Sequence, residues 1–196
     1  MDKMKNGAVL RNGTQRTAKE VFEKYAIVIA FLALLLVVSI LCSSFLTPSN
    51  LILVLNQTSI NGILAVGITY VLITAGIDIS IGSVVGLSGV ISAMVVKAGA
   101  PLPVGFLCGI LAGTLVGVII GILVTKGKLA PYIVTLGFLT IIRGAALLIA
   151  GGRPISSLGD AYGWIGNHNV FGVIPCPVII FLIVVVIGHI ILAHLQ

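Results

Sequence analysis

Long apolar runs separated by short polar breaks make up most of this chain. Residues 26–46 carry no charge, and 21 residues form a helix of about 31 Å, which matches the hydrocarbon thickness of a bilayer. Residues 51–96 contain one charge, Asp78, over a length that suits two spans. Further apolar runs cover 103–125, 131–150 and 173–195. The pattern predicts an all-α polytopic membrane protein with about six transmembrane helices.

Helix-breaking residues set the expected boundaries. The proline after the first run ends that span, and Ser49 or Asn50 is expected to cap the next helix. Gly76 is expected to end the second span, and Asp78 or Ser80 to cap the third. The first two breaks between spans are therefore predicted at residues 47–50 and 75–80.

Two later breaks follow the same logic. Pro131 suits the first turn of the fifth span, directly after the basic loop 126–128. The fifth span is expected to end at 151–154, and a polar loop is predicted to follow to about residue 172.

The charge distribution predicts the topology. Six of the eleven Lys and Arg residues fall within the first 24 positions, and basic segments favour the cytoplasmic side. Residues 1–25 are therefore expected to form a cytoplasmic basic segment, with a short helix after the capping-box pattern at 17–20. The 126–128 loop falls on the same side, so the N- and C-termini are both predicted to be cytoplasmic and 151–172 to lie outside.

The composition excludes several classes of protein. Hydrophobic residues make up 59% of the chain and charged residues 8%, whereas soluble domains are about 25% charged, so the main surroundings are predicted to be membrane lipid. The net charge of +6 is not arranged as a nucleic-acid-binding face. The three cysteines and three histidines lack ligand spacing, and no phosphate-binding loop is present. No metal, cofactor or catalytic residue is predicted.

Glycines recur at helical spacing in two spans. Such rows let neighbouring helices approach closely in a bilayer, so close packing within the chain or between subunits is the main interpretation and a pore-lining role is the alternative. The rows are Gly105, Gly109, Gly113, Gly117 and Gly121 in the fourth span, and Gly82, Gly86, Gly89 and Ala93 in the third.

Two charges lie inside the apolar region. Arg143 is placed twelve residues into the fifth span, where a charge is costly unless it faces protein or water; we expect it to pair or to face a pathway, with snorkelling as the alternative. Asp78 stands at a helix break. It is interpreted either as a helix cap or as part of a transport path or subunit contact.

Two other classes of function remain as alternatives. Gly86-Leu87-Ser88-Gly89 resembles the G-x-S-G motif of rhomboid intramembrane serine proteases, with His189 as a possible base. An ion-coupled secondary carrier is the other, although it would be expected to hold more ionisable residues inside the membrane than this chain does.

Four segments resemble one family of transporters. Residues 61–83 are similar to the signature of ribose-type sugar ABC transporter permeases, and 129–144 are similar to the second block of that family. Residues 151–155 and 172–178 resemble the segments that follow, so that the resemblance covers about residues 45–195.

The resemblance implies a function and its partners. Such permeases form dimers in the bacterial cell membrane, receive sugar from an extracytoplasmic binding protein and are driven by a cytoplasmic ATP-binding subunit. It implies that this chain is not itself an enzyme, and that 26–196 is the N-terminal portion of a transmembrane permease domain for ribose or a similar pentose. The residues that match the motifs, and are therefore candidates for the pathway or its framework, are Asp78, Ser80, Gly82, Ser83, Arg143 and Arg153.

The resemblance also exposes a departure. Members of the family continue beyond the sixth span into a cytoplasmic segment that meets the ATPase and then into further helices, whereas this sequence stops at Gln196. A truncated product that does not transport, or a permease split over two polypeptides, is expected. We expect that this chain alone cannot be driven by an ATPase.

Overall fold

The computed structural model describes residues 23–170, 172 and 174–194. It divides into two units, Met1–Leu51 and Ile52–Gln196, and each is considered by itself. The predicted capping box at 17–20 lies outside the described residues, as does most of the predicted cytoplasmic segment 1–25.

The described part of the first unit comprises one apolar helix, Glu23–Leu41, the turn that follows it and the first residues of the next helix. The helix ends five residues earlier than the predicted boundary at 46, because residues 42–47 form successive turns. The Phe45 N–H donates to the Cys42 carbonyl at 3.0 Å, and the Thr47 N–H donates to Ser44 at 3.3 Å.

Thr47 caps the next helix, α2 (Pro48–Ile73). Its hydroxyl oxygen accepts a hydrogen bond from the Asn50 backbone N–H at 3.4 Å, the usual bond between a cap and the third helical residue. The prediction that Ser49 or Asn50 would cap this helix is therefore wrong. The proline occupies the first helical position, where its missing N–H costs nothing, so the cap lies one residue before it.

The end of α2 uses an alanine where the sequence suggested a glycine. Ala75 has a φ of 57°, and the Gly76 N–H donates to the Val71 carbonyl at 3.0 Å. This is the left-handed turn that commonly closes a helix. The break falls where it was expected, but the left-handed residue precedes Gly76.

Asp78 shapes the turn before α3 (Ile81–Lys97). Its carboxylate accepts hydrogen bonds from the Ser80 backbone N–H at 2.7 Å and from the Ser80 hydroxyl at 2.6 Å. Ser80 occupies the N-cap position of α3, but its side chain makes no capping bond to the helix. The acidic side chain thus stabilises the turn rather than the first helical N–H groups, which corrects the expectation that it or Ser80 would cap α3 directly.

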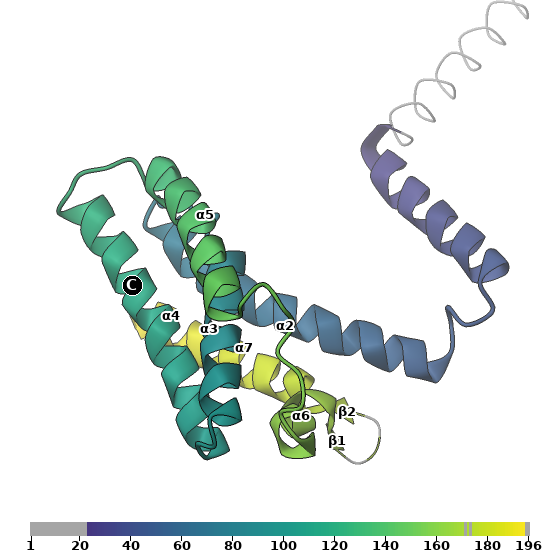
Figure 1. Cartoon of the computed structure of the whole chain (residues 1–196). Helices are drawn as coiled ribbons and strands as arrows, with labels where there is room; N and C mark the ends of the chain where they lie inside the picture. Colours follow the sequence, from purple (N-terminus) through teal and green to yellow (C-terminus); the bar gives the residue numbers. More distant parts are fainter. Residues whose placement is uncertain (1–22, 171, 173, 195–196) are drawn as a thin grey trace, which may run out of the picture. The chain divides into compact units, whose positions relative to one another are not determined.

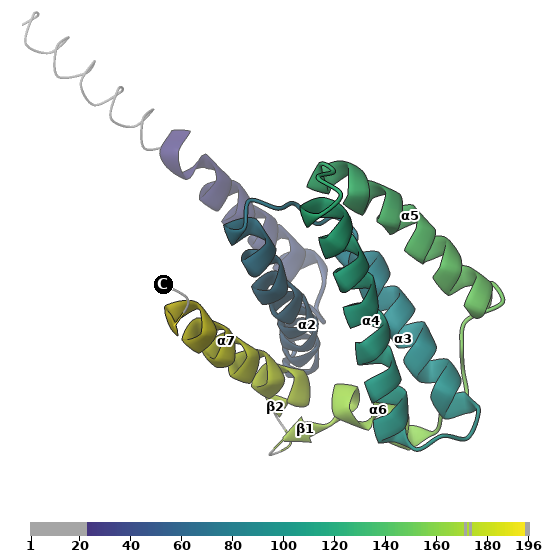
Figure 2. The ribbon, with the colours of Figure 1, turned by 90° about the vertical axis from the view of Figure 1, so that its left-hand side faces the viewer.

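Helices α3, α4 (Leu102–Thr125) and α5 (Pro131–Ile149) pack side by side, as both ribbon views show (Figures 1 and 2). Short connections join them, which favours antiparallel neighbours. Pro131 occupies the first turn of α5, as predicted. The buried core of this group comprises Leu87, Ile142 and Ala146.

The segment predicted to be a polar loop contains short regular elements. It holds the short helix α6 (Asp160–Asn167) and the strand β1 (Asn169–Val170), which pairs antiparallel with β2 (Ile174–Pro175). Hydrophobic periodicity does not predict these elements, because each is shorter than the window over which that periodicity becomes informative.

Helix α7 (Cys176–His194) crosses α2 within the second unit. The Tyr70 hydroxyl donates a hydrogen bond to the Gly188 carbonyl. A side chain at Gly62 would meet the ring of Phe181 at 2.5 Å. The two helices are therefore linked through the long side chains of Tyr70 and Phe181.

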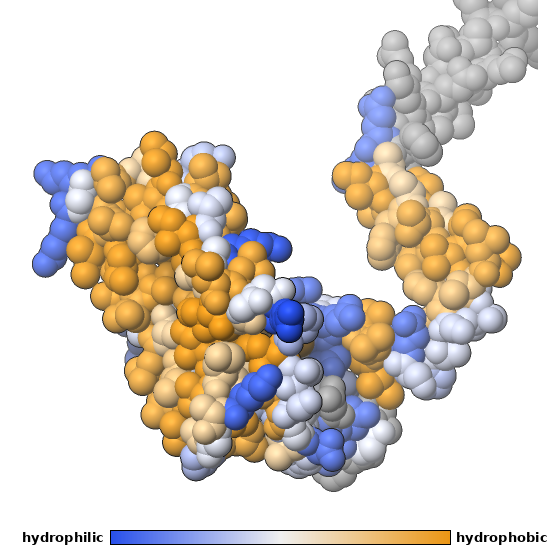
Figure 3. Space-filling model, viewed as in Figure 1, coloured by the Kyte–Doolittle hydropathy of each residue, from blue (hydrophilic) through white to orange (hydrophobic). Residues whose placement is uncertain are grey.

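The chain is a multi-pass membrane protein. Five of the described helices are long and apolar enough to cross a membrane, and α3 adds a shorter apolar helix of 17 residues. The space-filling view shows hydrophobic residues over most of α4 and α5, with hydrophilic residues gathered near the helix ends (Figure 3). Exposed apolar surface on this scale is typical of a membrane or protein interface, and together with the five candidate spans it confirms the predicted all-α polytopic fold.

Candidate functional site

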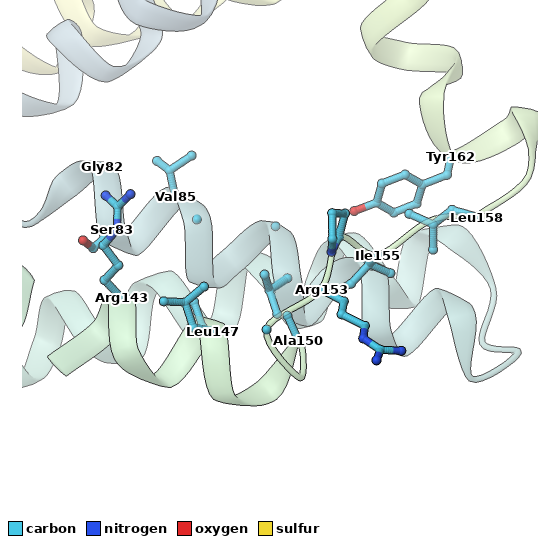
Figure 4. Close-up of a pocket in the computed structure, with 17 residues that line it drawn as sticks. Gly82, Ser83, Val85, Arg143, Leu147, Ala150, Arg153, Ile155, Leu158 and Tyr162 are labelled. Atoms are coloured by element: carbon cyan, nitrogen blue, oxygen red, sulfur yellow. The ribbon is translucent and has the colours of Figure 1, made fainter. Parts of the chain in front are cut away.

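A cavity of about 820 Å³ lies between α3 and α5, and we refer to it as the α3–α5 groove (Figure 4). Its volume falls within the range typical of small-molecule sites. The segment after α5 and the start of α6 complete its walls. The lining residues include Gly82, Ser83, Val85, Gly86 and Gly89 of α3, Arg143 and Leu147 of α5, and Ile155, Leu158 and Tyr162 beyond them.

Arg143 and Ser83 lie together at one end of the groove (Figure 4). Ser83 is 7% exposed, and its hydroxyl donates to the Leu139 carbonyl of α5 at 2.8 Å. This bond holds α3 against α5 one turn before Arg143. The arginine side chain is exposed in the groove, where its guanidinium can offer up to five N–H donors to a polar ligand.

Three glycines of α3 form an open wall of this groove. A methyl group built on Gly82, Gly86 or Gly89 would meet no atom within 4 Å. Close packing within this chain therefore does not explain these three glycines. The last member of the same row, Ala93, is buried, with 6% of its surface exposed. Two interpretations remain for these three glycines, packing against another subunit and a pore-lining role.

The glycine row of α4 has two different parts. A methyl group on Gly105 or Gly109 would stand within 3.0 Å of α3 atoms, including the Ser88 carbonyl oxygen at 2.8 Å from the Gly109 position. Gly113 is similarly close to the Ser88 hydroxyl. Gly117 and Gly121 face open space. The first three glycines thus let α3 and α4 approach, and the last two do not contact α3.

Asp78 and Ser80 lie outside the groove. Ser80 is fully buried and Asp78 is half-buried, and the two are joined by the hydrogen bonds described above. The Thr135 hydroxyl of α5 lies 3.2 Å from the Ile77 carbonyl, although its single proton has a nearer acceptor in the Pro131 carbonyl of its own helix at 2.9 Å. Asp78 and Ser80 thus form the turn that precedes the first residue of α3.

Arg153 follows the end of α5, where two consecutive glycines adopt left-handed conformations, with φ of 64° at Gly151 and 68° at Gly152. The Gly152 N–H donates a hydrogen bond to the Leu147 carbonyl at 2.9 Å. This turn carries the chain around the mouth of the groove. Arg153 contributes to the lining, but its guanidinium points away from Arg143 (Figure 4).

The motif residues therefore separate into two groups. The structure brings Gly82, Ser83 and Arg143 together in the groove, with Arg153 at its mouth, and leaves Asp78 and Ser80 in the supporting turn. Sequence reasoning gave Tyr162 and Leu158 no role in a site, because they lie in the segment predicted to be a polar loop. The glycine pair at 151–152 was the available signal that the chain turns back over α5.

The residues of the protease alternative do not meet. Ser88 lies on the α4 side of α3, in a cavity that it shares with Gly109 and Phe106. His189 lies on α7 in a different cavity, beside Thr69 and Tyr70 of α2. A nucleophile requires its base within hydrogen-bond reach, so this geometry does not support a serine protease.

Comparison with known proteins places the chain in a transporter family. Residues 50–194 match the family described as the permease component of branched-chain amino acid transport systems. The chain belongs to this permease family and is a multi-pass protein of the bacterial cell membrane. No solved structure matches it.

Several curated proteins are similar over most of the chain. The ribose import permease protein RbsC of Bacillus subtilis is 41% identical over 168 residues, covering 85% of this chain and 52% of that protein. The corresponding protein of Haemophilus influenzae is 40% identical, covering 84% and 52%. The autoinducer 2 import system permease protein LsrD of Escherichia coli is 35% identical, covering 78% and 49%. The chain thus spans about half the length of the curated relatives it matches.

Proposed function

We propose that this chain is a membrane-spanning part of the permease of an ATP-driven importer for ribose or a similar small sugar. Three curated relatives with 35–41% identity are named as import permeases, two for ribose and one for autoinducer 2. The observation that carries the proposal is the α3–α5 groove in a chain of this family. It joins Gly82 and Ser83 to Arg143, residues that are some sixty positions apart in the sequence.

The chemistry of the groove suits a neutral polar solute. Glycine and aliphatic side chains line most of it, and a serine hydroxyl and a guanidinium supply a few polar groups. Small-molecule sites commonly combine a mostly apolar lining with a few placed polar groups. A sugar matches this pattern, because its hydroxyls accept hydrogen bonds while its C–H groups tolerate apolar walls.

The partners follow from the same proposal. The permease pairs with a second permease subunit, receives sugar from an extracytoplasmic binding protein and is driven by a cytoplasmic ATP-binding subunit. The chain itself hydrolyses no ATP in this scheme. The N-terminus and the 126–128 loop are cytoplasmic, so the mouth of the groove near 151–158 opens outward.

Uptake of radiolabelled D-ribose tests the proposal. Cells without their own ribose importer would express the protein together with the other polypeptides of its own system, namely the remainder of the permease, the ATP-binding protein and the sugar-binding protein. We expect uptake that stops when ATP is depleted and persists when the proton gradient is collapsed. Uptake that instead followed the proton gradient would favour the ion-coupled carrier.

A matched pair of substitutions tests the role of the groove. Gly86→Leu places a bulky side chain in the groove, whereas Gly117→Leu places the same side chain on the open part of α4. Because neither position has an atom within 4 Å of an added Cβ, both variants are expected to fold. We expect Gly86→Leu to abolish most ribose uptake and Gly117→Leu to retain it. Equal uptake by the two variants, at equal protein levels, would exclude the groove from the pathway.

A further inference from the structure

Tyr162 of α6 stands where two cavities meet. One is the α3–α5 groove, and the other is a cavity of about 350 Å³ between α3 and α4. The residues that line both are Val85, Gly89 and Tyr162. Tyrosine has the largest side chain of these three residues. An added Cβ at Gly89 would meet nothing within 4 Å.

The ring is held in place from its α4 side. Tyr162 and Phe106 stack with their ring centroids 5.6 Å apart and their planes inclined by 21°, within the usual geometry of an aromatic pair. Phe106 itself lines only the smaller cavity. The other side of the tyrosine ring is therefore left to face the α3–α5 groove, and Figure 4 shows its hydroxyl directed toward the segment that carries Ile155.

Another contact steadies α6. The Asn56 side-chain amide of α2 donates to the Gly166 carbonyl at 3.0 Å. Together with the Phe106 stack, this bond ties both ends of the short helix to longer helices. The tyrosine ring is thus presented by an anchored element, which is what a contact surface for a ligand requires.

We propose that Tyr162 is a specificity-determining residue whose ring forms the first contact for a cyclic sugar at the mouth of the α3–α5 groove. This inference rests on the proposed transport function and adds a recognition residue to it. A sugar ring presents an apolar C–H face that packs on an aromatic ring, while its hydroxyls remain free to bond elsewhere. An open-chain polyol of the same size presents no such face.

This contact is separate from that of Arg143. The α5 helix rises about 10 Å between Arg143 and Ala150, and Tyr162 lies beyond the Ala150 end of the groove (Figure 4). One sugar ring does not bridge that distance. The groove therefore offers two successive positions, an aromatic one at the mouth and a guanidinium further in.

A fluorescent reporter tests the contact directly. The chain contains one tryptophan, Trp164, so the double variant Tyr162→Trp/Trp164→Phe carries its only tryptophan at the proposed position. The unaltered protein is the matched control, because Trp164 lies on the same helix, is 57% exposed and lines neither cavity. Iodide quenching would be measured in lipid nanodiscs with saturating D-ribose, with ribitol and with neither.

We expect D-ribose to lower the quenching constant of the reporter at least about twofold, since a bound ligand covers most of the surface it contacts. Ribitol, and either compound with the control, should cause no change. An unchanged reporter, or an equal response to ribose and ribitol, would overturn the inference.

Uptake by the complete transport system separates this result from the proposed function. We expect Tyr162→Phe to keep ribose uptake and Tyr162→Leu to lose about two- to tenfold, the range expected for one aromatic contact, while Trp164→Leu changes little. Ribose uptake by the unaltered protein with a silent reporter would overturn only the role of Tyr162. A responsive reporter without ATP-driven uptake would overturn the transport function and leave the sugar contact standing.

Discussion

At the scale of single residues, the glycines of this chain show how one pattern serves two purposes. Gly109 and Gly117 belong to the same row on α4, at the same spacing. Gly109 is buried against the Ser88 carbonyl, while Gly117 has no neighbour within 4 Å. The spacing alone predicts a common face but does not reveal which part of that face meets another helix, because a second helix touches a long one over only part of its length.

Replacing each of these glycines with alanine tests the distinction. Gly109→Ala is expected to destabilise the protein by about 1–3 kcal/mol, because the new methyl group would stand 2.8 Å from a backbone oxygen. Gly117→Ala should leave stability unchanged or raise it by up to about 1 kcal/mol, since alanine is the better helix former. Reversible unfolding in mixed micelles measures both. Equal effects would contradict the packing described for α3 and α4.

Buried serines allow a second comparison at this scale. The Ser83 hydroxyl bonds across to Leu139 of α5, whereas the Ser59 hydroxyl bonds to Leu55 of its own helix. Both side chains are less than 10% exposed. Interhelical bonds of this kind contribute about 0.6 kcal/mol on average and up to about 1.7. We expect Ser83→Ala to lose stability within that range and Ser59→Ala to lose less, in the same unfolding assay.

At the scale of elements, the long helices followed from the sequence and the short ones did not. The apolar runs predict α2, α4, α5 and α7 to within a few residues, because a membrane span requires a long uninterrupted stretch. Helix α6 has only eight residues and depends on contacts with distant helices, among them the stack of Tyr162 on Phe106. The local pattern of apolar and polar residues does not reveal contacts with distant helices. The part of the groove that α6 provides was therefore not predicted.

The ends of α2 and α5 share one geometry with different residues. Ala75 and Gly151 each occupy the left-handed position after the helix, with φ of 57° and 64°. A left-handed conformation costs a residue with a Cβ about 1–2 kcal/mol, partly offset by the extra freedom of glycine in the unfolded chain.

Substitutions at these two positions should therefore have opposite signs. Ala75→Gly is expected to stabilise the protein by up to about 1 kcal/mol, and Gly151→Ala to destabilise it by about the same amount, for the reasons of strain and chain entropy together. Thermal unfolding of the detergent-solubilised protein gives both values. A loss of stability in both variants would mean that Ala75 makes contacts that glycine cannot replace.

At the scale of the whole molecule, the block 78–83, which resembles part of a family signature, is divided between two places in the structure. Gly82 and Ser83 line the groove, while Asp78 and Ser80 form the turn that positions α3. The sequence marks these residues as one block, and nothing in their order separates the two groups. The packing of α3 against α5 separates them, because successive side chains of a helix point in different directions and only some of them face the groove.

The function proposed for the groove also requires a defined orientation in the membrane. If the basic N-terminus is cytoplasmic, the segment after α5 faces outward and the 126–128 loop faces inward. Tyr162 then stands at the side from which sugar arrives, and Arg143 lies deeper along the path. The opposite orientation would place the aromatic contact at the exit and would remove its role as the first contact.

Cysteine labelling of intact cells decides the orientation. Ser156→Cys and Lys126→Cys place thiols at exposed positions in the two loops, and the unaltered protein, with its three native cysteines, serves as the background. We expect a membrane-impermeant maleimide to label the Ser156→Cys variant in intact cells and the Lys126→Cys variant only after the membrane is opened. The reverse pattern would invert the topology, and the groove would then open toward the cytoplasm at its aromatic end.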